Sequence, residues 1–177
     1  MAMPLPAAAD SRMKRVLFLC TANSARSILA EAILARKGAG RFQALSAGSK
    51  PRGEPNPLAL RLLVERGHEV RDLRSKSWDE FAGSGAAAVD LVITVCDNAA
   101  GESCPVWPGH PVQAHWGIPD PAGEGHDGAL DDFALAYDRL AERIDRLLAL
   151  DEARLEPREW RDAVAAIGRE CEGATGG

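Results

Sequence analysis

Cys20 and Arg26 stand at the two ends of a short polar loop in the stretch RVLFLCTANSARS, residues 15–27. A cysteine thiolate is a strong nucleophile, and an arginine guanidinium offers a planar fork of N–H donors that fits two oxygens of a tetrahedral anion. The residues between them are small or polar, so successive backbone N–H groups can curl around such an anion. These residue types in this order indicate an oxyanion site with a nucleophile at its base.

The loop after Cys20 is predicted to bind the oxyanion. It consists of Thr21, Ala22, Asn23, Ser24, Ala25, Arg26 and Ser27. Asn23 tolerates the left-handed backbone that a tight loop requires, and Ser27 can donate its hydroxyl to the Cys20 sulfur. The N–H groups, Arg26 and the start of a helix all favour negative charge, so we expect the pKa of the Cys20 thiol to lie below its ordinary value of about 8.5. The alternative is a buried structural cysteine beside a solvated arginine.

The segments around this loop follow a repeating strand and helix pattern. Short apolar runs predict strands at Val16–Cys20, Phe42–Ser46, Leu91–Cys96 and Val112–Ile118. Between them, helices are predicted at Ser27–Lys37, Pro57–Arg66 and Trp78–Ala82. This alternation is typical of an α/β fold, a three-layer sandwich with parallel strands and helices on both faces of the sheet. The loop then lies where a strand passes into a helix, whose N-terminus favours an anion.

Two amphipathic helices are predicted near the C-terminus. In the first, apolar residues recur at intervals of three and four: Leu130, Phe133, Tyr137, Leu140, Ile144, Leu147 and Leu148. A second follows Pro157 and carries Trp160, Val164 and Ile167 on one side. We expect residues 14–170 to form a single domain, and residues 1–13 and 171–177 to be disordered ends.

The composition argues against several classes of function. The chain has 177 residues, a formal net charge of −5 and no basic stripe, so nucleic acid is not expected as a partner. No apolar run approaches the ~20 residues of a membrane span, and residues 1–13 lack a signal-peptide pattern. We therefore expect a cytoplasmic protein that does not contact membranes. In that compartment the four cysteines favour chemistry or metal binding over a disulfide framework.

The stretch VLFLCTANSARS resembles the anion loop of the low-molecular-weight protein tyrosine phosphatases, and more closely that of the thioredoxin-coupled arsenate reductases with the same fold. The resemblance extends through SAGS, DLVITVCD and HWGIPDPA, and so covers nearly the whole expected domain. It implies a four-stranded parallel sheet flanked by helices. In that family an aspartate followed by a proline is the general acid, which Asp120 and Pro121 match; the alternative is a turn-forming Asp-Pro pair.

A pair of cysteines, Cys96 and Cys104, lies in the stretch TVCDNAAGESCPVWPG. In the arsenate reductases such a pair relays oxidation and is followed by HWG and then Asp-Pro, which is the order found here. The resemblance implies that Cys20 attacks arsenic, Asp120 protonates the leaving oxygen, and Arg26 with the loop amides holds the charge. Cys96 then attacks Cys20 and releases arsenite, and Cys104 attacks Cys96.

The implied reductant is thioredoxin, with glutaredoxin or a low-molecular-weight thiol as alternatives. No cofactor is implied, and we expect a monomer.

A phosphatase of the same fold stays open as a second function, although such enzymes usually carry aromatic residues after the Asp-Pro pair and here none occurs before Phe133. A redox-sensing or zinc-binding module is a third, with the pair Cys96 and Cys104 as its working part and His110 and His115 as the further ligands of a zinc site. Their spacing does not match structural zinc sites, so no metal site is expected.

This chain departs from the family near the loop. Glycine is common where Ala22 stands and a second cysteine where Ala25 stands. Some relatives bind potassium beside the loop through an asparagine, a glutamate, a serine and an aspartate. The first three are matched by Asn23, Glu31 and Ser46, while Lys76 stands near the aspartate position. We expect the Lys76 ammonium to replace the cation; the alternative is a solvated lysine.

Other conspicuous side chains are predicted to be structural. The tryptophans Trp78, Trp107, Trp116 and Trp160 are expected to pack in the core or on the surface. His68 is expected to be solvated, and Cys171 to be a spare thiol near the end of the chain.

Overall fold

The strands and helices alternate along the chain as the sequence predicts. The computed structural model describes residues 13–83, 85–96, 107, 110–119, 121, 129–151 and 153–175, with the backbone alone for 170–175. The elements in chain order are β1 (Lys14–Cys20), α2 (Arg26–Lys37), β2 (Phe42–Gly48), α3 (Pro57–Glu65), the 3₁₀ helix η1 (Trp78–Phe81), β3 (Leu91–Thr94), β4 (Val112–His115), α5 (Leu130–Ala149) and α6 (Pro157–Thr175).

The four strands form one parallel sheet in the order β2-β1-β3-β4, which confirms the predicted α/β fold. The central strand β1 is fully buried from Val16 to Leu19, as expected for a strand with neighbours on both edges and cover on both faces. Its last residue, Cys20, lies opposite Gly48 of β2. This register places the end of β1 and the end of β2 side by side at the carboxyl edge of the sheet.

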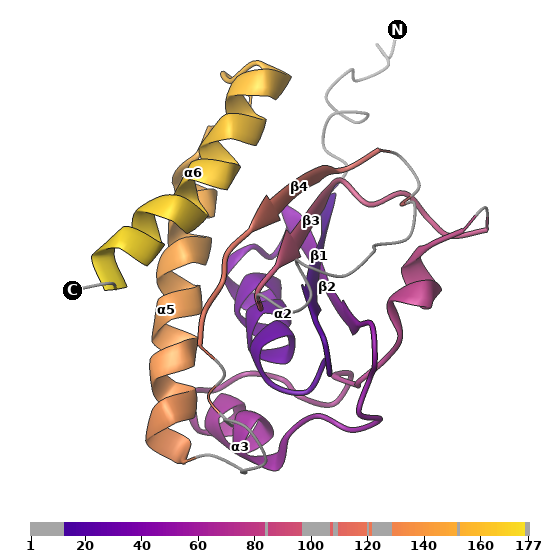
Figure 1. Cartoon of the computed structure of the whole chain (residues 1–177), viewed down its shortest axis with the longest axis vertical. Coiled ribbons are helices and arrows are strands. Elements are labelled where there is room, and N and C mark those ends of the chain that lie inside the picture. The colour runs from indigo at the N-terminus through magenta and orange to yellow at the C-terminus, as the bar shows by residue number, and fades with distance from the viewer. Residues whose placement is uncertain are drawn as a thin grey trace, which may run out of the picture.

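Two apolar layers cover the sheet (Figure 1). Helices α2 and α5 pack against each other, and their buried residues join one face of β1 and β3 in the larger hydrophobic cluster. On the other face a smaller cluster contains Leu17, Leu19 and Trp107, with Trp78 of η1 packed against it. Trp78 and Trp107 meet edge to face, with 6.2 Å between ring centroids. The prediction that the tryptophans are packing residues is confirmed for both.

The strand order creates a crevice at the carboxyl end of the sheet. From β1 the chain crosses to β2 on one side, whereas β3 adds on the other side of β1. Connections that leave in opposite directions open a crevice between the two strand ends, where open α/β sheets commonly bind ligands. The loop after β1 and the segment after β3 therefore meet at this point, and Val95 N donates to Leu19 O across it (2.9 Å).

The strands β3 and β4 end earlier than the sequence predicts. β3 stops at Thr94 and β4 at His115, although apolar residues continue to Cys96 and Ile118. Beyond Thr94 the side chains of Val95 and Cys96 stay buried, and Val95 still makes backbone hydrogen bonds with Leu19 and Ile118 on either side. The apolar residues therefore predict correctly which positions are buried here, but they do not predict where the strands end.

The C-terminal helices lie along the β4 side of the sheet (Figure 1). In α6 Trp160, Val164 and Ile167 are buried, which confirms the predicted apolar side of this helix. α6 continues to Thr175, so residues 171–175 are helical where the sequence predicts a disordered tail. Adding residues to an existing helix costs little compared with nucleating one, and this helix is anchored by its earlier turns. The side chain of Cys171 lies outside the described residues.

His68 is buried, and the prediction that it is solvated is wrong. Its exposed fraction is 8%, and its Nε2 atom hydrogen-bonds the Tyr137 hydroxyl of α5 at 2.5 Å. Burial, together with nearby arginines, lowers the pKa of the imidazole. The contact joins residues far apart in the sequence, so no local pattern signals it.

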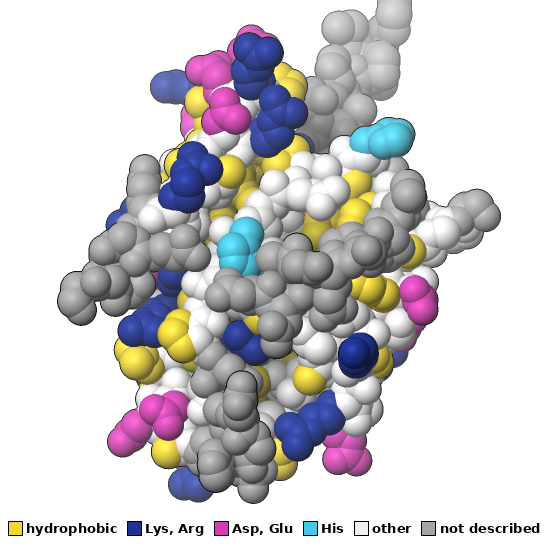
Figure 2. Space-filling model, viewed as in Figure 1, with side chains coloured by type: hydrophobic (Ala, Val, Ile, Leu, Met, Phe, Trp, Pro, Cys, Tyr) yellow, Lys and Arg dark blue, Asp and Glu magenta, His cyan; other side chains and the backbone are white. Residues whose placement is uncertain are grey.

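The surface carries charges of both signs. On the face shown in Figure 2, basic and acidic side chains are scattered and hydrophobic ones form small separate patches. Within the described part of the chain, no helix is long and apolar enough to cross a membrane.

Gly48 is expected to be required for the fold of the loop after β1. A Cβ atom at this position would overlap the carbonyl oxygen of Thr21, a backbone atom that cannot move aside freely. We predict that Gly48→Ala lowers the free energy of unfolding by about 2 kcal/mol in urea denaturation, the order of an overpacked core. Gly85→Ala is the control, because a Cβ there meets nothing within 4 Å. Equal stability of both variants would contradict this account.

Candidate active site

The loop after β1 is held open by hydrogen bonds from residues 50–56. Lys50 N donates to Thr21 O, Arg52 N to Ala22 O and Asn56 N to Ser24 O, at 2.8 to 2.9 Å. The carbonyls of the loop are thus turned outward. Because the C=O and N–H of a trans peptide point in opposite directions, its amides are left to face the loop centre. Such a ring of N–H groups is a concave anion site.

Asn23 has the left-handed backbone conformation that the sequence predicts for it, with φ of 47°. Its side chain is fully buried and donates to Ser27 Oγ (2.8 Å) and Ser46 Oγ (3.0 Å). Its Oδ1 accepts from the backbone N–H of Lys76 (2.9 Å). Asn23 therefore joins the loop to α2, β2 and the segment before η1. The predicted bond from Ser27 to the Cys20 sulfur stays a prediction.

Cys20 lies at the floor of the loop with 4% of its surface exposed. The hydrogen bond with the Cys96 side chain, followed by burial, raises the pKa of the Cys20 thiol well above its ordinary value. The Arg26 guanidinium and the N–H of Ala22 act in the opposite direction. The predicted lowering of this pKa is therefore wrong for this arrangement. The groups predicted to lower this pKa, Arg26 and a loop N–H, are present, but the hydrogen bond with Cys96 and burial have the larger effect.

Cys96 lies against both Cys20 and the loop. It follows the end of β3 by two residues, is 2% exposed, and its Sγ is 3.7 Å from Thr21 Oγ1. Neither cysteine forms a disulfide in the structure. The crevice between β1 and β3 thus brings together two thiols that are far apart in the sequence. Two thiols this close can be linked as a disulfide once a group bound to one of them leaves with the electron pair.

Arg26 is the first residue of α2, at the helix end where the backbone dipole favours an anion. Its Nη1 donates to Ile118 O (3.0 Å), which links the start of α2 to the segment that follows β4. The guanidinium is therefore at the rim of the loop that begins with Cys20. Its predicted grip on two oxygens of an anion stays a prediction.

Two predicted site residues, Asp120 and Cys104, lie outside the described residues. The residues before Asp120, Ile118 and Pro119, are described, and Ile118 is buried with its N–H bonded to Val95 O (3.2 Å). The chain that leads to Asp120 therefore passes the same crevice as Cys96. The roles predicted for both residues stay predictions.

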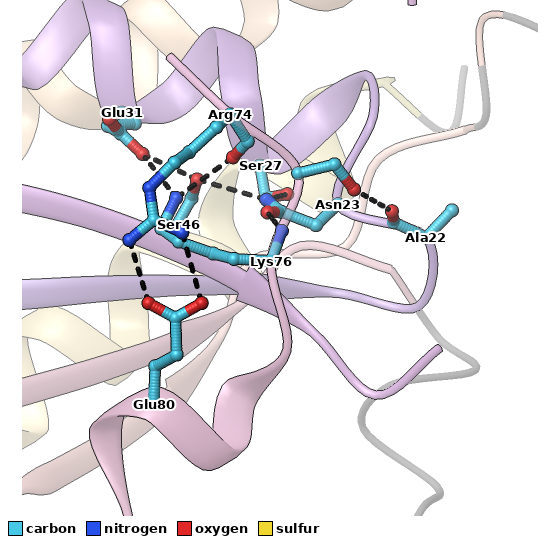
Figure 3. A network of polar contacts seen from close by, with 9 residues as sticks. Ala22, Asn23, Ser27, Glu31, Ser46, Arg74, Lys76 and Glu80 are labelled. Carbon is cyan, nitrogen blue, oxygen red and sulfur yellow. Dashed lines mark hydrogen bonds and ion pairs between the residues drawn. The ribbon is translucent and has the colours of Figure 1, made fainter. Parts of the chain in front are cut away.

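A buried polar network lies behind the loop (Figure 3). Ser46 Oγ donates to Glu31 Oε1 (2.5 Å), and Lys76 Nζ is 3.6 Å from the same oxygen. Lys76 also donates to Arg74 O (3.0 Å), and the Gly48–Ser77 bridge fixes this segment along the edge of β2. Only 7% of the Lys76 side chain is exposed. The alternative of a solvated lysine is wrong, and the ammonium lies beside the glutamate and serine that the resemblance named.

The two charges in this network depend on each other. Burial raises the pKa of Glu31, and Lys76, followed by Ser46, partly offsets this. Burial likewise lowers the pKa of Lys76, and Glu31 offsets it. Removing either partner leaves a buried uncompensated charge, which is far more costly than losing an exposed ion pair. Outside the buried pair, Arg74 makes a bidentate contact with Glu80, at 2.7 and 3.0 Å.

Of the residues named for a zinc site, Cys104 lies outside the described residues, and the two histidines are not brought together. His110 precedes β4 and His115 ends it, so they lie at opposite ends of this strand. Five extended residues span about 16 Å, far beyond the reach of one ion. His115 Nδ1 instead contacts Thr94 Oγ1 (2.7 Å) at the end of β3. Among the described residues no group of three potential metal ligands occurs.

Sequence reasoning missed some contacts around the crevice. Arg143 of α5 is 1% exposed and its Nη2 donates to Gly117 O (3.4 Å), beside the segment that leads to Asp120. The sequence shows Arg143 only as a charge near the apolar side of a helix. Its one local signal is that it interrupts the apolar spacing between Leu140 and Leu147.

The sequence is similar to known proteins over most of its length. The model of the family described as low molecular weight phosphotyrosine protein phosphatase matches residues 15–158. An arsenate reductase of Bacillus licheniformis is 36% identical over 141 residues, which are 78% of this chain and 98% of the relative.

Solved structures share the fold. The thioredoxin-dependent arsenate reductase of Corynebacterium glutamicum superposes with a TM-score of 0.58 at 29% identity, over 78% of this chain and 61% of that one. A low molecular weight protein tyrosine phosphatase from T. tengcongensis gives a TM-score of 0.59 at 25% identity, over 76% and 97%. Both the reductases and the phosphatases are thus represented among the similar structures.

Cys96 is predicted to control the ionisation of Cys20. Because its side-chain contact is the largest cause that raises the pKa of the Cys20 thiol, Cys96→Ala should lower that pKa. The measurement is the pH dependence of iodoacetamide alkylation at Cys20, read by mass spectrometry. We expect the alkylation profile of Cys96→Ala to move to lower pH, and that of the control Cys171→Ala to stay in place. An unchanged profile in Cys96→Ala would show that burial alone sets the pKa.

Lys76 is predicted to stabilise the protein most at neutral and higher pH. In Lys76→Met the pKa of Glu31 rises further above its ordinary value of 4.5. As the pH rises above 4.5, Glu31 then loses its proton more readily in the unfolded state than in the native state, which favours unfolding. The loss of unfolding free energy should be about 3 kcal/mol at pH 8 and smaller at pH 5, where protonation relieves the buried charge. Urea denaturation at the two pH values measures it.

Two further variants test this cause. Adding Glu31→Gln to Lys76→Met removes the buried anion and should abolish the pH dependence of the loss. Lys37→Met breaks an exposed pair with Asp145 (2.8 Å) and should cost less than about 1 kcal/mol at either pH. A loss in Lys76→Met that is equal at pH 5 and pH 8 would refute the charge argument.

Proposed function

The chain belongs to the low-molecular-weight phosphotyrosine protein phosphatase family, and from this premise we propose that it is an arsenate reductase. The observation that carries the proposal is the contact between the thiols of Cys20 and Cys96 at the floor of the anion loop. Hydrolysis of a phosphate ester does not require a second thiol at this position. A reductase needs one there, because a second thiol must attack the Cys20 sulfur to release arsenite.

In the first step the Cys20 thiolate attacks arsenic of a bound arsenate. A sulfur–arsenic bond forms and one oxygen leaves as water after protonation, a role that we assign to Asp120. The loop amides and Arg26 hold the remaining oxygens, whose negative charge the N-terminus of α2 also favours. An arsenate that enters must displace Cys96 from Cys20, which removes the main cause of the raised thiol pKa.

In the second step Cys96 attacks the Cys20 sulfur. The new sulfur–sulfur bond forms as the sulfur–arsenic bond breaks, and its electron pair stays on arsenic, which leaves as arsenite. The buried position of Cys96 within reach of Cys20 supports this role. Thr21 Oγ1, 3.7 Å from the Cys96 sulfur, lies where its hydroxyl can donate to the developing thiolate.

In the third step Cys104 attacks Cys96, and the Cys20 thiolate is released for another turnover. A dithiol reductant then reduces the Cys96–Cys104 disulfide, so that one arsenate and one dithiol give one arsenite, one disulfide and water. We propose thioredoxin as this reductant, because the similar reductase of Corynebacterium glutamicum is thioredoxin-dependent. Glutaredoxin or a small thiol would leave the first two steps unchanged.

Hydrolysis of phosphate monoesters is a second activity of the same loop. It is favoured by the family match and by the similar phosphatase from T. tengcongensis. It requires Cys20, Arg26 and Asp120 but neither Cys96 nor Cys104.

The two activities are predicted to separate on mutation. Arsenate with thioredoxin, thioredoxin reductase and NADPH should drive NADPH oxidation by the wild-type protein. Cys96→Ser and Cys104→Ser should each reduce this turnover at least about 100-fold, because each interrupts the relay. Hydrolysis of p-nitrophenyl phosphate by the same variants should fall no more than about threefold below wild type.

Cys20→Ser is the control for both assays and should abolish each activity. The wild-type protein could instead hydrolyse the ester and fail to oxidise NADPH with thioredoxin, glutaredoxin and a small thiol. That result would refute the reductase function and favour the phosphatase.

A further inference from the structure

We propose that the C-terminal helix α6 holds residues 116–118, which lead to the predicted general acid Asp120, in place through Trp116, which makes Trp116 a positioning residue. The inference rests on the proposed function, since it concerns the segment that leads to Asp120. It adds a part of the chain that the family match does not cover, because that match ends at residue 158 and α6 spans Pro157–Thr175.

Residues 116–118 are held at three successive positions by three different helices. Trp116 Nε1 donates to Val164 O of α6 (3.0 Å), and Arg143 Nη2 of α5 donates to Gly117 O (3.4 Å). Arg26 Nη1 of α2 donates to Ile118 O (3.0 Å). The first of these contacts comes from α6, so this helix is part of the support for the segment.

The Trp116 contact cannot be replaced by water. The side chain has 0% exposure and lies 6.4 Å from the Phe18 ring of β1, between centroids. A buried indole N–H without an acceptor costs about 1–3 kcal/mol. The position of the Trp116 indole is therefore coupled to that of the Val164 carbonyl. Because Trp116 is one residue past β4, the position of its ring fixes how the chain leaves the strand.

Gly168 permits α6 to lie this close to β4. A Cβ atom at Gly168 would overlap the carbonyl oxygen of His115 and come within 2.9 Å of Trp116 Cδ1. The helix backbone therefore rests on the end of β4, one turn beyond Val164. Glycine costs helix stability relative to alanine, and here the close approach accounts for it.

The consequence for the reaction is geometric. Asp120 is four residues beyond Trp116, and general acids act only within hydrogen-bond reach of the leaving oxygen. A displacement of about 1 Å can cost ~100-fold in rate. Trp116 touches no reacting atom in this account, and its effect should be confined to steps that need the proton.

The test compares two esters on purified full-length protein. Phenyl phosphate needs a proton on its leaving oxygen, whereas 2,4-dinitrophenyl phosphate has a leaving group that departs without one. Trp116→Phe keeps the ring and removes the N–H donor. We expect its kcat/KM, which reports transfer of the phosphoryl group to Cys20 and release of the phenol, to fall about 10- to 100-fold on phenyl phosphate and less than about threefold on the dinitrophenyl ester.

The matched control is Trp160→Phe. Trp160 is also buried on α6, but its Nε1 has no hydrogen-bond partner among the described residues. The kcat/KM of Trp160→Phe should match that of wild type on both esters. Gly168→Ala is the second test variant, which leaves the indole intact, and it should reproduce the selective loss seen in Trp116→Phe.

The outcomes separate this inference from the proposed function. An equal fall on both esters in Trp116→Phe, or no fall, would overturn the positioning role. Wild-type protein that turns over arsenate but hydrolyses neither ester would overturn it as well, because a held general acid should assist phenol departure. If the wild-type protein lacks arsenate turnover while Trp116→Phe shows the selective ester loss, the proposed function is refuted and the positioning role stands.

Discussion

The outward turn of the loop carbonyls is the constraint on which the site depends. Three amides from residues 50–56 take the carbonyls of Thr21, Ala22 and Ser24, and the Asn23 side chain fixes the tightest point of the loop. With the carbonyls occupied, the loop amides can serve an anion. Gly48 makes this possible, since only a residue without a Cβ lets the loop lie against the end of β2.

The site is also built around charge that is already compensated inside the protein. The buried Lys76 ammonium beside Glu31 supplies a positive charge behind the loop, where the resemblance suggests a bound cation in some relatives. Asn23 contacts both the loop and the Lys76 backbone, so the pair supports the loop mechanically as well as electrostatically. A lysine that is part of the chain cannot dissociate, so the loop keeps this charge in any salt.

The sequence predicts what is local and misses what is long-range. The strand, loop and helix from Val16 to Lys37 follow from apolar spacing and small polar residues, and the left-handed Asn23 was within reach of the same reasoning. His68 is misjudged because its partner Tyr137 lies on another helix. The resemblance implies that Cys96 meets Cys20, but the pKa of Cys20 is misjudged because no local pattern shows the Cys96 hydrogen bond and the burial that the strand order gives this thiol. The contact of α6 with Trp116 has the same cause.

The relay of oxidation from Cys20 through Cys96 is the central claim, and one measurement tests it most directly. Reduced protein is allowed a single turnover with arsenate and no reductant, its free thiols are alkylated, and its disulfides are mapped by mass spectrometry. The account predicts a Cys96–Cys104 disulfide in the wild-type protein that is absent in Cys20→Ser. Arsenate that binds while every thiol remains free would contradict it and leave a phosphatase loop with an unused second cysteine.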